Sequence, residues 1–530
     1  MHDLRLPFHD EPAPRGVPAL ADGPATHLPL LSIVVLVYNT AQYLRECFDS
    51  LLAQDYANIE IIAIDDDSDD GSWQICCEYE TAHPRLRCLR KTNEGGAVAG
   101  NLGMSLARGE YVALVDSDDV VPPDGYRQLM AAAVAERADI AIGRAARLRE
   151  GQVLAGAFLY EPFVWRQPRS LAALGEFPYL IHDCFYWNKV FRTAFLHEHG
   201  LGMVPGLLYA DRPFVHRAYY LSRRTTIVPA LVYYWRQRPA GAQASISQSL
   251  GTIANFEDRI RSFLIEWDEF ADLPEAQDHR RMVAVYNLQR ALLPLQGIAS
   301  SPAFRAAFVT GVQRLLQAYG DLDFSALGVR KAMYLELIRR GWIEELCFMV
   351  GDAGNCRTVE LDDGCYWSQP LLDNPERPLP REGMRLRFPT IGFFRVSAIE
   401  ARDGALRLVL DISDRIMAEC DVHFELQSVH DARGHRLQPE GRVEEGRWAY
   451  RLDLAQAAPA QGLYGVVLTY SGGPYAGHYR IGRQLATPEL CAALPLEAGD
   501  GQPFYSQEVG GLGLRVGPPT GAAACGLHGS

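Results

Sequence analysis

Short apolar runs alternate with amphipathic segments over the first quarter of the chain. Residues 32–37 read Ser-Ile-Val-Val-Leu-Val, a continuous β-branched run typical of a buried strand in a parallel sheet. Thr40 stands where it could cap a helix whose apolar positions have the spacing of an amphipathic helix, namely Leu44, Cys47, Phe48, Leu51 and Leu52. The pattern recurs, with strands expected at 59–64, 86–90 and 111–115 and helices at 72–82, 97–107 and 124–136. This alternation predicts right-handed βαβ units and an α/β domain on a parallel sheet.

Polar residues follow three of these strands directly. They are Tyr38-Asn39, Asp65-Asp66 and Asp116-Ser117-Asp118. The carboxyl ends of parallel strands meet at one edge of a sheet, where ligands bind in open α/β folds. Taken alone, Asp116-Ser117-Asp118 could equally be a solvated acidic turn, because Asp is common in turns. The three strand ends together predict a nucleotide-binding domain.

The pattern of apolar positions along the chain changes twice after residue 250. Helical stripes dominate residues 252–350, whereas short strands at turn-punctuated spacing follow residue 380 and indicate a β-sandwich. The expected organisation is a flexible leader at 1–30, an α/β domain at 31–250, a helical region at 251–350, a linker at 351–380, a β-sandwich at 381–518 and a flexible tail at 519–530.

Composition narrows the class of protein. With 48% hydrophobic and 22% charged residues and a net charge of −14, the 530-residue chain resembles an ordinary globular protein and not a nucleic-acid binder. Its eleven cysteines are scattered and never spaced CxxC, which favours reduced thiols in the cytoplasm. No apolar run approaches the ~20 residues of a transmembrane helix, and no secretory signal is apparent. We expect a cytoplasmic protein; peripheral association with the inner face of the membrane stays open.

A series of motifs, in order, resembles family 2 glycosyltransferases with the nucleotide-sugar-binding GT-A fold. These motifs are the strand ending in Val37-Tyr38-Asn39, the aspartate turn at 65–71, the glycine segment at 93–103, the strand and Asp-x-Asp motif at 109–119, Asn188-Lys189, Asp211 with Pro213-Phe214, and residues 233–247. The resemblance covers about residues 31–250. The wider layout is similar to soluble wall teichoic acid glycosyltransferases, whose C-terminal parts serve oligomerisation or acceptor binding, so a homo-oligomer formed through this region is an expectation.

The sequence departs from the family pattern at four positions. Leu36 replaces the usual Pro, Asp67 the usual Gly of the aspartate turn, Gly100 a frequent Arg, and Ala210 the Glu that normally precedes Asp211. The last change matters most, because the Glu-Asp pair supplies the general base in the family. One carboxylate remains.

The resemblance implies a nucleoside diphosphate sugar donor, expected to be a UDP-sugar. Asp66 would accept a hydrogen bond from the uracil N–H. The predicted donor-binding residues are Val37, Tyr38, Asn39, Asp66, Asn93, Asn101, Asp116, Ser117, Arg236 and Arg238. The forked donors of Arg236 and Arg238 suit diphosphate oxygens in a loop that ends at Ser245-Ile246-Ser247, although a plain surface loop is the alternative.

The resemblance also assigns the metal and the base. Asp118, helped by Asp116, would hold Mn²⁺ or Mg²⁺, both of which prefer oxygen ligands. Asp211 would take the proton of the acceptor hydroxyl, and one base with direct displacement predicts inversion at the anomeric carbon. The alternative for Asp211 is a helix start ahead of Pro213.

A sugar or acceptor pocket is the remaining prediction. Trp187, Asn188 and Lys189 would shape it, with a structural turn as the alternative.

The leading functional hypothesis is a metal-dependent inverting hexosyl- or N-acetylhexosaminyltransferase that acts on a glycan or glycopolymer of the cell envelope. A catalytically decayed relative, serving as a glycan-binding or scaffold protein, is the second hypothesis, motivated by Gly100 and Ala210. A nucleotidyltransferase is the third, disfavoured because Tyr38-Asn39-Thr40 is not a Gly-rich basic loop.

Overall fold

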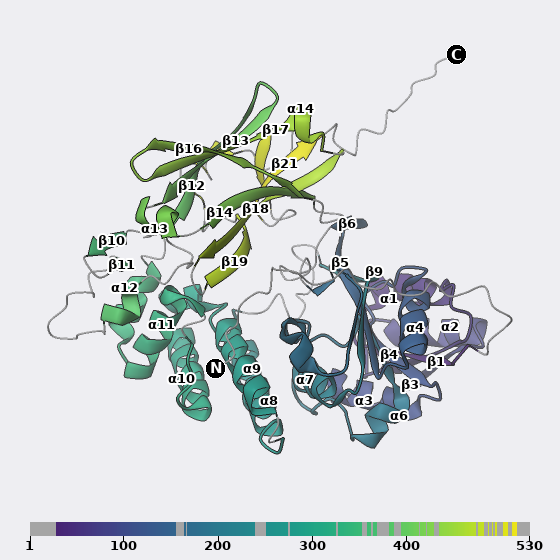
Figure 1. Ribbon diagram of the computed structural model, residues 1–530. Coiled ribbons are helices and arrows are strands. Elements are labelled where there is room, and N and C mark those ends of the chain that lie inside the picture. Colours follow the sequence, from purple (N-terminus) through teal and green to yellow (C-terminus); the bar gives the residue numbers. More distant parts are fainter. Residues whose placement is uncertain are drawn as a thin grey trace, which may run out of the picture. The chain divides into compact units, whose positions relative to one another are not determined.

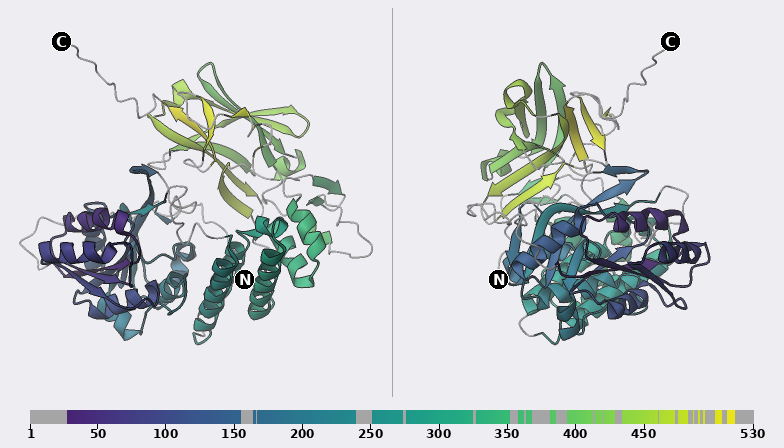
Figure 2. Two further views of the ribbon diagram at one scale, coloured as in Figure 1. Left: turned by 180° about the vertical axis from the view of Figure 1, so that it is seen from behind. Right: turned by 90° about the vertical axis from the view of Figure 1, so that its right-hand side faces the viewer.

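The computed structural model of the chain (Figures 1 and 2) forms two compact units, within residues 11–322 and 323–530. It describes residues 28–516 except 155–163, 166, 239–250, 274–275, 325–326, 352–357, 362–363, 368–380, 386–393, 413, 420, 429–433, 460, 473–474, 482–485, 487–489, 491–492, 495–501 and 507–510. The predicted tail, most of the leader and linker, and Ser245-Ile246-Ser247 therefore lie outside the described residues.

The first unit is built on a nine-stranded sheet with the order β3-β2-β1-β4-β8-β5-β9-β7, and β6 pairs with β5. Its strands are β1 (Leu31–Val37), β2 (Ile59–Asp65), β3 (Leu86–Arg90), β4 (Tyr111–Asp116), β5 (Ile140–Arg149), β6 (Gln152–Leu154), β7 (Arg169–Leu171), β8 (Lys189–Arg192) and β9 (Thr225–Arg236). The neighbours β3, β2, β1 and β4 are parallel, as predicted. The sheet as a whole is mixed, because the four-residue β8 runs antiparallel to both β4 and β5. The predicted α/β class is confirmed.

Helices cover both faces of this sheet (Figure 1). The helices of the whole unit are α1 (Ala41–Leu52), α2 (Ser72–Ala82), α3 (Gly96–Leu106), α4 (Gly125–Glu136), α6 (Thr193–Glu198), α7 (Asp211–Leu221), α8 (Ile253–Glu269), α9 (Gln277–Ala291) and α10 (Pro302–Tyr319), of which the last three lie beyond α7 and not on the sheet. Alternation along β1 shows the two cores: Ile33 and Val35 pack in one cluster with Phe48 of α1, whereas Val34 packs in the other with Met104 of α3. Helix α8 packs against α7, so the helical segment that follows the sheet belongs to the same unit.

The second unit begins with α11 (Val329–Arg340) and α12 (Ile343–Gly351) and continues as two antiparallel sheets. One sheet has the order β12-β13-β17-β16, and the other has β15-β14-β18-β21-β20 with β19 beside β18. The elements are β10 (Thr358–Leu361), β11 (Gly364–Trp367), β12 (Phe394–Arg402), β13 (Ala405–Ile412), α13 (Asp414–Glu419), β14 (Asp421–Ser428), β15 (Gly434–Arg436), β16 (Gln438–Glu444), β17 (Arg447–Asp453), α14 (Leu454–Ala457), β18 (Gly462–Gly472), β19 (Tyr475–Arg480), β20 (Pro503–Ser506) and β21 (Gly511–Val516).

The core of this unit contains side chains from both sheets. Leu408 and Leu410 of β13 share one apolar cluster with Phe424 of β14 and Val466 of β18. Burial of both inner faces against each other is the arrangement of a β-sandwich, as predicted. Among the described residues, no helix is both long enough and apolar enough to span a bilayer.

Candidate functional site

Three strand ends meet at one edge of the large sheet. Val37 of β1 pairs with Asp65 of β2, and Leu36 pairs with Asp116 of β4. The turns that follow β1, β2 and β4 therefore lie side by side, which is the placement expected from the sequence.

Asp66 organises the turn beyond β2. Its side chain is buried, and Oδ1 accepts hydrogen bonds from Lys91 Nζ at 2.7 Å and the Glu94 amide at 3.1 Å. Oδ2 accepts from the Gly95 amide at 2.8 Å. The glycine segment is thus hydrogen-bonded to Asp66, the carboxylate that was predicted to bind the uracil ring of the donor.

Two residues in these turns have left-handed backbone. Asn39 has φ = 50° and Asp67 has φ = 65°, a region that Asn and Asp tolerate better than other residues with a Cβ. This tolerance explains how Asp67 can stand in place of the family's Gly. The Thr40 hydroxyl does not cap α1 as expected, because it lies 2.7 Å from the Ser117 hydroxyl of the neighbouring turn.

Carboxylates are concentrated after β4. Burial and the nearby charge of Asp118 raise the pKa of Asp116 to about 7. The Tyr186 hydroxyl donates to Asp116 Oδ1 at 2.6 Å. Burial and both neighbouring carboxylates also raise the pKa of Asp119, whose Oδ1 accepts from the Arg236 amide at 2.7 Å.

The two predicted diphosphate arginines lie at this cluster. Arg236 Nε donates to the Asp118 carbonyl oxygen at 2.6 Å, and its Nη2 pairs with Glu46 at 2.6 Å. Arg238 donates to Asp118 Oδ2 from Nε at 2.9 Å and from Nη2 at 2.7 Å. Both guanidinium groups lie near the ring of Tyr43, at 5.0 and 5.7 Å from its centroid. Arg238 therefore forms an ion pair with Asp118, the carboxylate that was predicted to bind the metal.

Asp116 and Asp118 fit a hard divalent cation. Within the described residues, no three side chains of His, Cys, Asp or Glu gather closely enough to hold a metal by themselves. Mg²⁺ and similar cations are commonly bound by one or two carboxylates, with substrate phosphates and water as the other ligands. Burial and the neighbouring charge of Asp118 disfavour the ionised form of Asp116, and a bound cation would offset both effects.

Asp211 is the residue predicted to act as the base. It is the first residue of α7, and its Oδ1 accepts from the Arg212 amide at 3.0 Å. Burial raises the pKa of Asp211 to about 6, against the opposing charge of Arg212. The charge of Asp211 contributes in turn to the raised pKa values of Asp116 and Tyr186. Ala210, which replaces the family's Glu, is buried in the apolar core.

The three predicted pocket residues face the interior instead. Lys189 is fully buried and donates to Asp183 Oδ2 at 2.9 Å and Asn188 Oδ1 at 2.6 Å. Asn188 donates to the Gly143 carbonyl at 2.9 Å. Trp187 is buried between the rings of Phe185 and Tyr233, at centroid distances of 4.9 and 4.6 Å. We therefore interpret Trp187, Asn188 and Lys189 as the support of the loop 183–189, because all three are buried and the polar groups of Asn188 and Lys189 are bonded within the protein.

Tyr186, which the sequence analysis missed, is the residue that this loop presents to the site. Burial and the charge of Asp116 raise the pKa of Tyr186 well above its ordinary value, so the hydroxyl remains a donor. Its only sequence signal was its position next to the Trp-Asn-Lys motif.

Other predicted donor-binding residues differ in burial and partners. Asn101 is occupied with the Met203 backbone, to which it donates at 2.7 Å and from which it accepts at 2.8 Å. A Cβ on Gly100 would lie 2.1 Å from Met203 Cε, so the missing Arg is accompanied by close packing at that position. Val37 and Ser117 are buried, whereas Tyr38 and Asn93 are exposed.

Comparison with known proteins agrees with this geometry. Residues 32–200 match the model of glycosyl transferase family 2. Glycosyltransferase GlyG of Streptococcus pneumoniae is 32% identical over 221 residues, which cover 39% of this chain and 71% of GlyG.

Solved structures extend the likeness in fold to most of the chain. S. aureus TarS superposes with a TM-score of 0.55 at 18% identity, over 93% of this chain and 86% of TarS. TarS residues 1–349 in complex with UDP-GlcNAc give a TM-score of 0.52 at 20% identity, over 66% of this chain and 98% of that one. With the sheet edge, the motif order and the identity to GlyG in agreement, the chain belongs to the family 2 glycosyltransferases.

Proposed function

We propose that the chain moves a sugar from a UDP-sugar to a hydroxyl group of a cell-envelope glycan or glycopolymer, in a cation-dependent reaction that inverts the anomeric carbon. The observation that carries the proposal is that Asp116 ends its strand at the sheet edge that also holds Asp66, with Asp118 two residues later, and that the charge of Asp211 acts on Asp116. Asp116 and Asp118 could bind a cation that neutralises the donor diphosphate, and Asp211 could act as the general base.

The nucleotide would sit over the turns after β1 and β2. Asp66 accepts three hydrogen bonds from the protein, and a carboxylate has about four lone-pair sites, so one remains for a uracil N–H. UDP-GlcNAc is bound by a TarS fragment of similar fold, which makes it the first donor to test.

The diphosphate would lie between Asp118 and the two arginines. Mn²⁺ or Mg²⁺, when bound by Asp116 and Asp118, supplies Lewis-acid stabilisation of the leaving diphosphate. Arg236 and Arg238 already lie at this point and offer forked donors to phosphate oxygens. Their present anionic partners are Asp118 and Glu46, which a diphosphate would replace in part.

Asp211 would act as the general base. With a pKa of about 6 it is ionised near neutral pH and still a better proton acceptor than an ordinary aspartate. The acceptor oxygen would attack the anomeric carbon from the face opposite the diphosphate as Asp211 takes its proton. Direct displacement with one base gives inversion.

The proposal has two further elements. The free thiols of the described cysteines agree with a reducing compartment, so we place the enzyme in the cytoplasm, with peripheral contact at the membrane left open. We also propose that the β-sandwich serves oligomerisation or acceptor binding.

The decisive experiment measures UDP binding by calorimetry with and without Mn²⁺, then donor hydrolysis over a panel of UDP-, GDP- and dTDP-sugars. We expect UDP binding that Mn²⁺ strengthens, and hydrolysis that Asp211→Asn abolishes. NMR of the released sugar would report the anomeric configuration. UDP and Mn²⁺ binding with no turnover of any donor would favour the second hypothesis, a glycan-binding protein on a decayed transferase, which Ala210 continues to motivate.

A further inference from the structure

A buried polar cluster lies behind the first turns of α7, outside the groups used by the proposed reaction. Its members are Arg212 and His216 of α7, Glu266 of α8 and Asn287 of α9, each at most 2% exposed. Buried ionic groups are costly unless they are paired, so their arrangement calls for an explanation beyond packing.

Glu266 is the anion on which the cluster converges. Its Oε1 contacts His216 Nδ1, while Oε2 lies 3.6 Å from Arg212 Nη2 and accepts from Asn287 Nδ2 at 2.6 Å. His216 Nε2 lies 2.8 Å from the Ile181 carbonyl, so each of its ring nitrogens faces an oxygen atom. Although burial opposes it, the charges of His216 and Arg212 lower the pKa of Glu266 to about 2.

Arg212 connects this cluster to the reaction. Its backbone amide donates to Asp211 Oδ1, while its guanidinium group is held near the rings of Phe263 and Tyr286, at 4.9 and 5.2 Å from their centroids. Arg212 also donates to Asn287 Oδ1. Arg212 therefore contacts the proposed base through its main chain, and it contacts residues of α8 and α9 through its side chain.

We propose that Glu266 is a positioning residue, which holds the guanidinium group of Arg212 on the α8–α9 side and so keeps the carboxylate of Asp211 free to accept the acceptor proton. The inference rests on the proposed function. Its physical basis is competition between two carboxylates, Glu266 and Asp211, for the charge of Arg212. In a low-dielectric interior, loss of the charge of Glu266 would leave the attraction between Arg212 and Asp211 unopposed. A base paired with a guanidinium group is a weaker base.

Several other groups act electrostatically at or beside Asp211, and all of them except His216, which contacts Glu266 directly, keep their partners in the experiment. They are His216 of α7, Arg290 of α9, Asp116 of β4, Cys184, Tyr186 and Lys189 of the 183–189 segment, and Tyr209 before α7.

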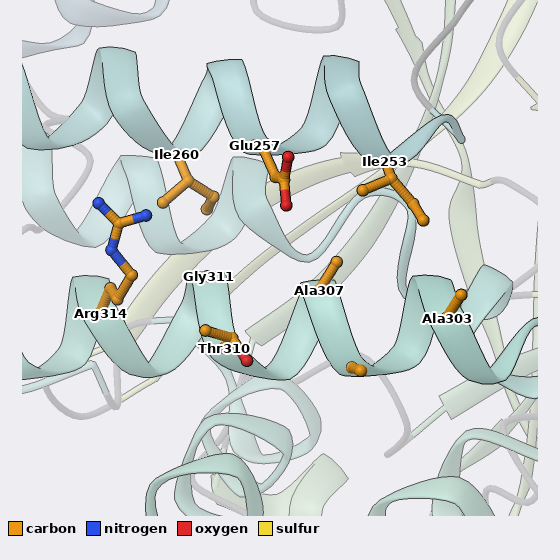
Figure 3. A pocket seen from close by; sticks show the side chains of 9 residues that line it. Ile253, Glu257, Ile260, Ala303, Ala307, Thr310, Gly311 and Arg314 are labelled. Atoms are coloured by element: carbon orange, nitrogen blue, oxygen red, sulfur yellow. The ribbon is translucent and has the colours of Figure 1, made fainter.

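The test compares Glu266→Gln with Glu257→Gln in the full chain. Glu257 stands on the same helix, is exposed, and lines a groove of about 400 Å³ between α8 and α10 (Figure 3), with no residue of the strand-edge site among the groove's lining residues. The probe is UDP-GlcNAc with Mn²⁺, or whichever panel donor the parent hydrolyses. We expect Glu266→Gln to lower kcat about tenfold with KM nearly unchanged, because base strength and not donor binding is altered. We expect the acidic limb of its pH profile to move to lower pH, and Glu257→Gln to behave like the parent.

A second variant separates positioning from folding. In Arg212→Met/Glu266→Gln the competing cation is gone as well, so kcat should rise above that of Glu266→Gln alone. A purely structural role predicts the reverse. A Glu266→Gln profile equal to the parent's, or a double variant slower than Glu266→Gln, overturns the inference while leaving the proposed function standing. A parent protein that hydrolyses no donor overturns the proposed function, and the inference with it.

Discussion

Asp211→Asn should inactivate the enzyme and at the same time make the folded protein more stable. The substitution keeps the size of the side chain and an oxygen able to accept from the Arg212 amide. It removes a negative charge that burial disfavours. Catalytic groups often lower the stability of the folded state, and we expect the buried charge of Asp211 to do so.

The magnitude follows from the pKa of Asp211. A rise from 3.8 to about 6 corresponds to about 3 kcal/mol against the ionised form in the folded state. Since the side chain is partly accessible to solvent, we expect a stabilisation of ~1–3 kcal/mol above about pH 6. Because the folded-state pKa lies above the ordinary value, the folded protein binds this proton more tightly, and the penalty grows as pH rises from about 4 to about 6. Below that window the variant and the parent should be equally stable.

Thermal unfolding at a series of pH values would measure this difference. An increase of ~1–3 kcal/mol corresponds to a rise in Tm of roughly 2–6 °C for a unit of this size. The matched control is Asp278→Asn, since Asp278 also stands in the first turn of a helix but is exposed. Donor hydrolysis measured on the same samples would report activity.

Two results would refute the reasoning. A gain in Tm that does not depend on pH between about 4 and 7 would mean that ionisation of Asp211 is not its source. Retained hydrolysis in Asp211→Asn would remove this residue as the base, whatever its effect on stability.

Three further predictions concern the same unit. The kcat of the parent should rise with pH and reach half its maximum near pH 6, because the base must lose its proton; a limb near pH 4 would contradict this. Mn²⁺ with UDP should raise Tm in the parent and in the control Asp124→Asn but not in Asp118→Asn, as followed by scanning calorimetry. Lys189→Met should lower the free energy of unfolding by ~3–5 kcal/mol in urea titrations, because it leaves Asp183 charged and buried without its cation; a loss below ~1 kcal/mol would argue against the ion pair.

The sequence was informative wherever the signal was local. The strand predicted at 32–37 is β1 at Leu31–Val37, and that predicted at 111–115 is β4 at Tyr111–Asp116. Continuous β-branched runs leave little choice of structure, and the parallel register then brings their ends together without further information. The placement of Asp66 and Asp116 at one edge followed from this alone.

The residues that the sequence did not reveal depend on contacts between distant segments. Tyr186 reaches Asp116, 70 positions earlier, because the Asp183–Lys189 pair holds the intervening loop. Glu266 lies 50 positions after His216, in a helix whose apolar stripe gave no sign of a buried carboxylate. The Trp187-Asn188-Lys189 motif was assigned to a pocket because motif matching identifies recurring residues without saying which way their side chains point.

The pairing of Arg238 with Asp118 links donor binding to cation binding. Both Nε and Nη2 of Arg238 bond to one oxygen of the carboxylate that would coordinate the cation. Repulsion between Arg238 and a cation on Asp118 opposes cation binding as long as the guanidinium group has no other anion nearby. A donor diphosphate supplies that anion, so each ligand should lower the cost of binding the other, and by linkage the effect must be equal in both directions. The same residues thus give a reason why the acidic cluster need not hold a cation tightly by itself, and why UDP and Mn²⁺ should be tested together before either is judged not to bind.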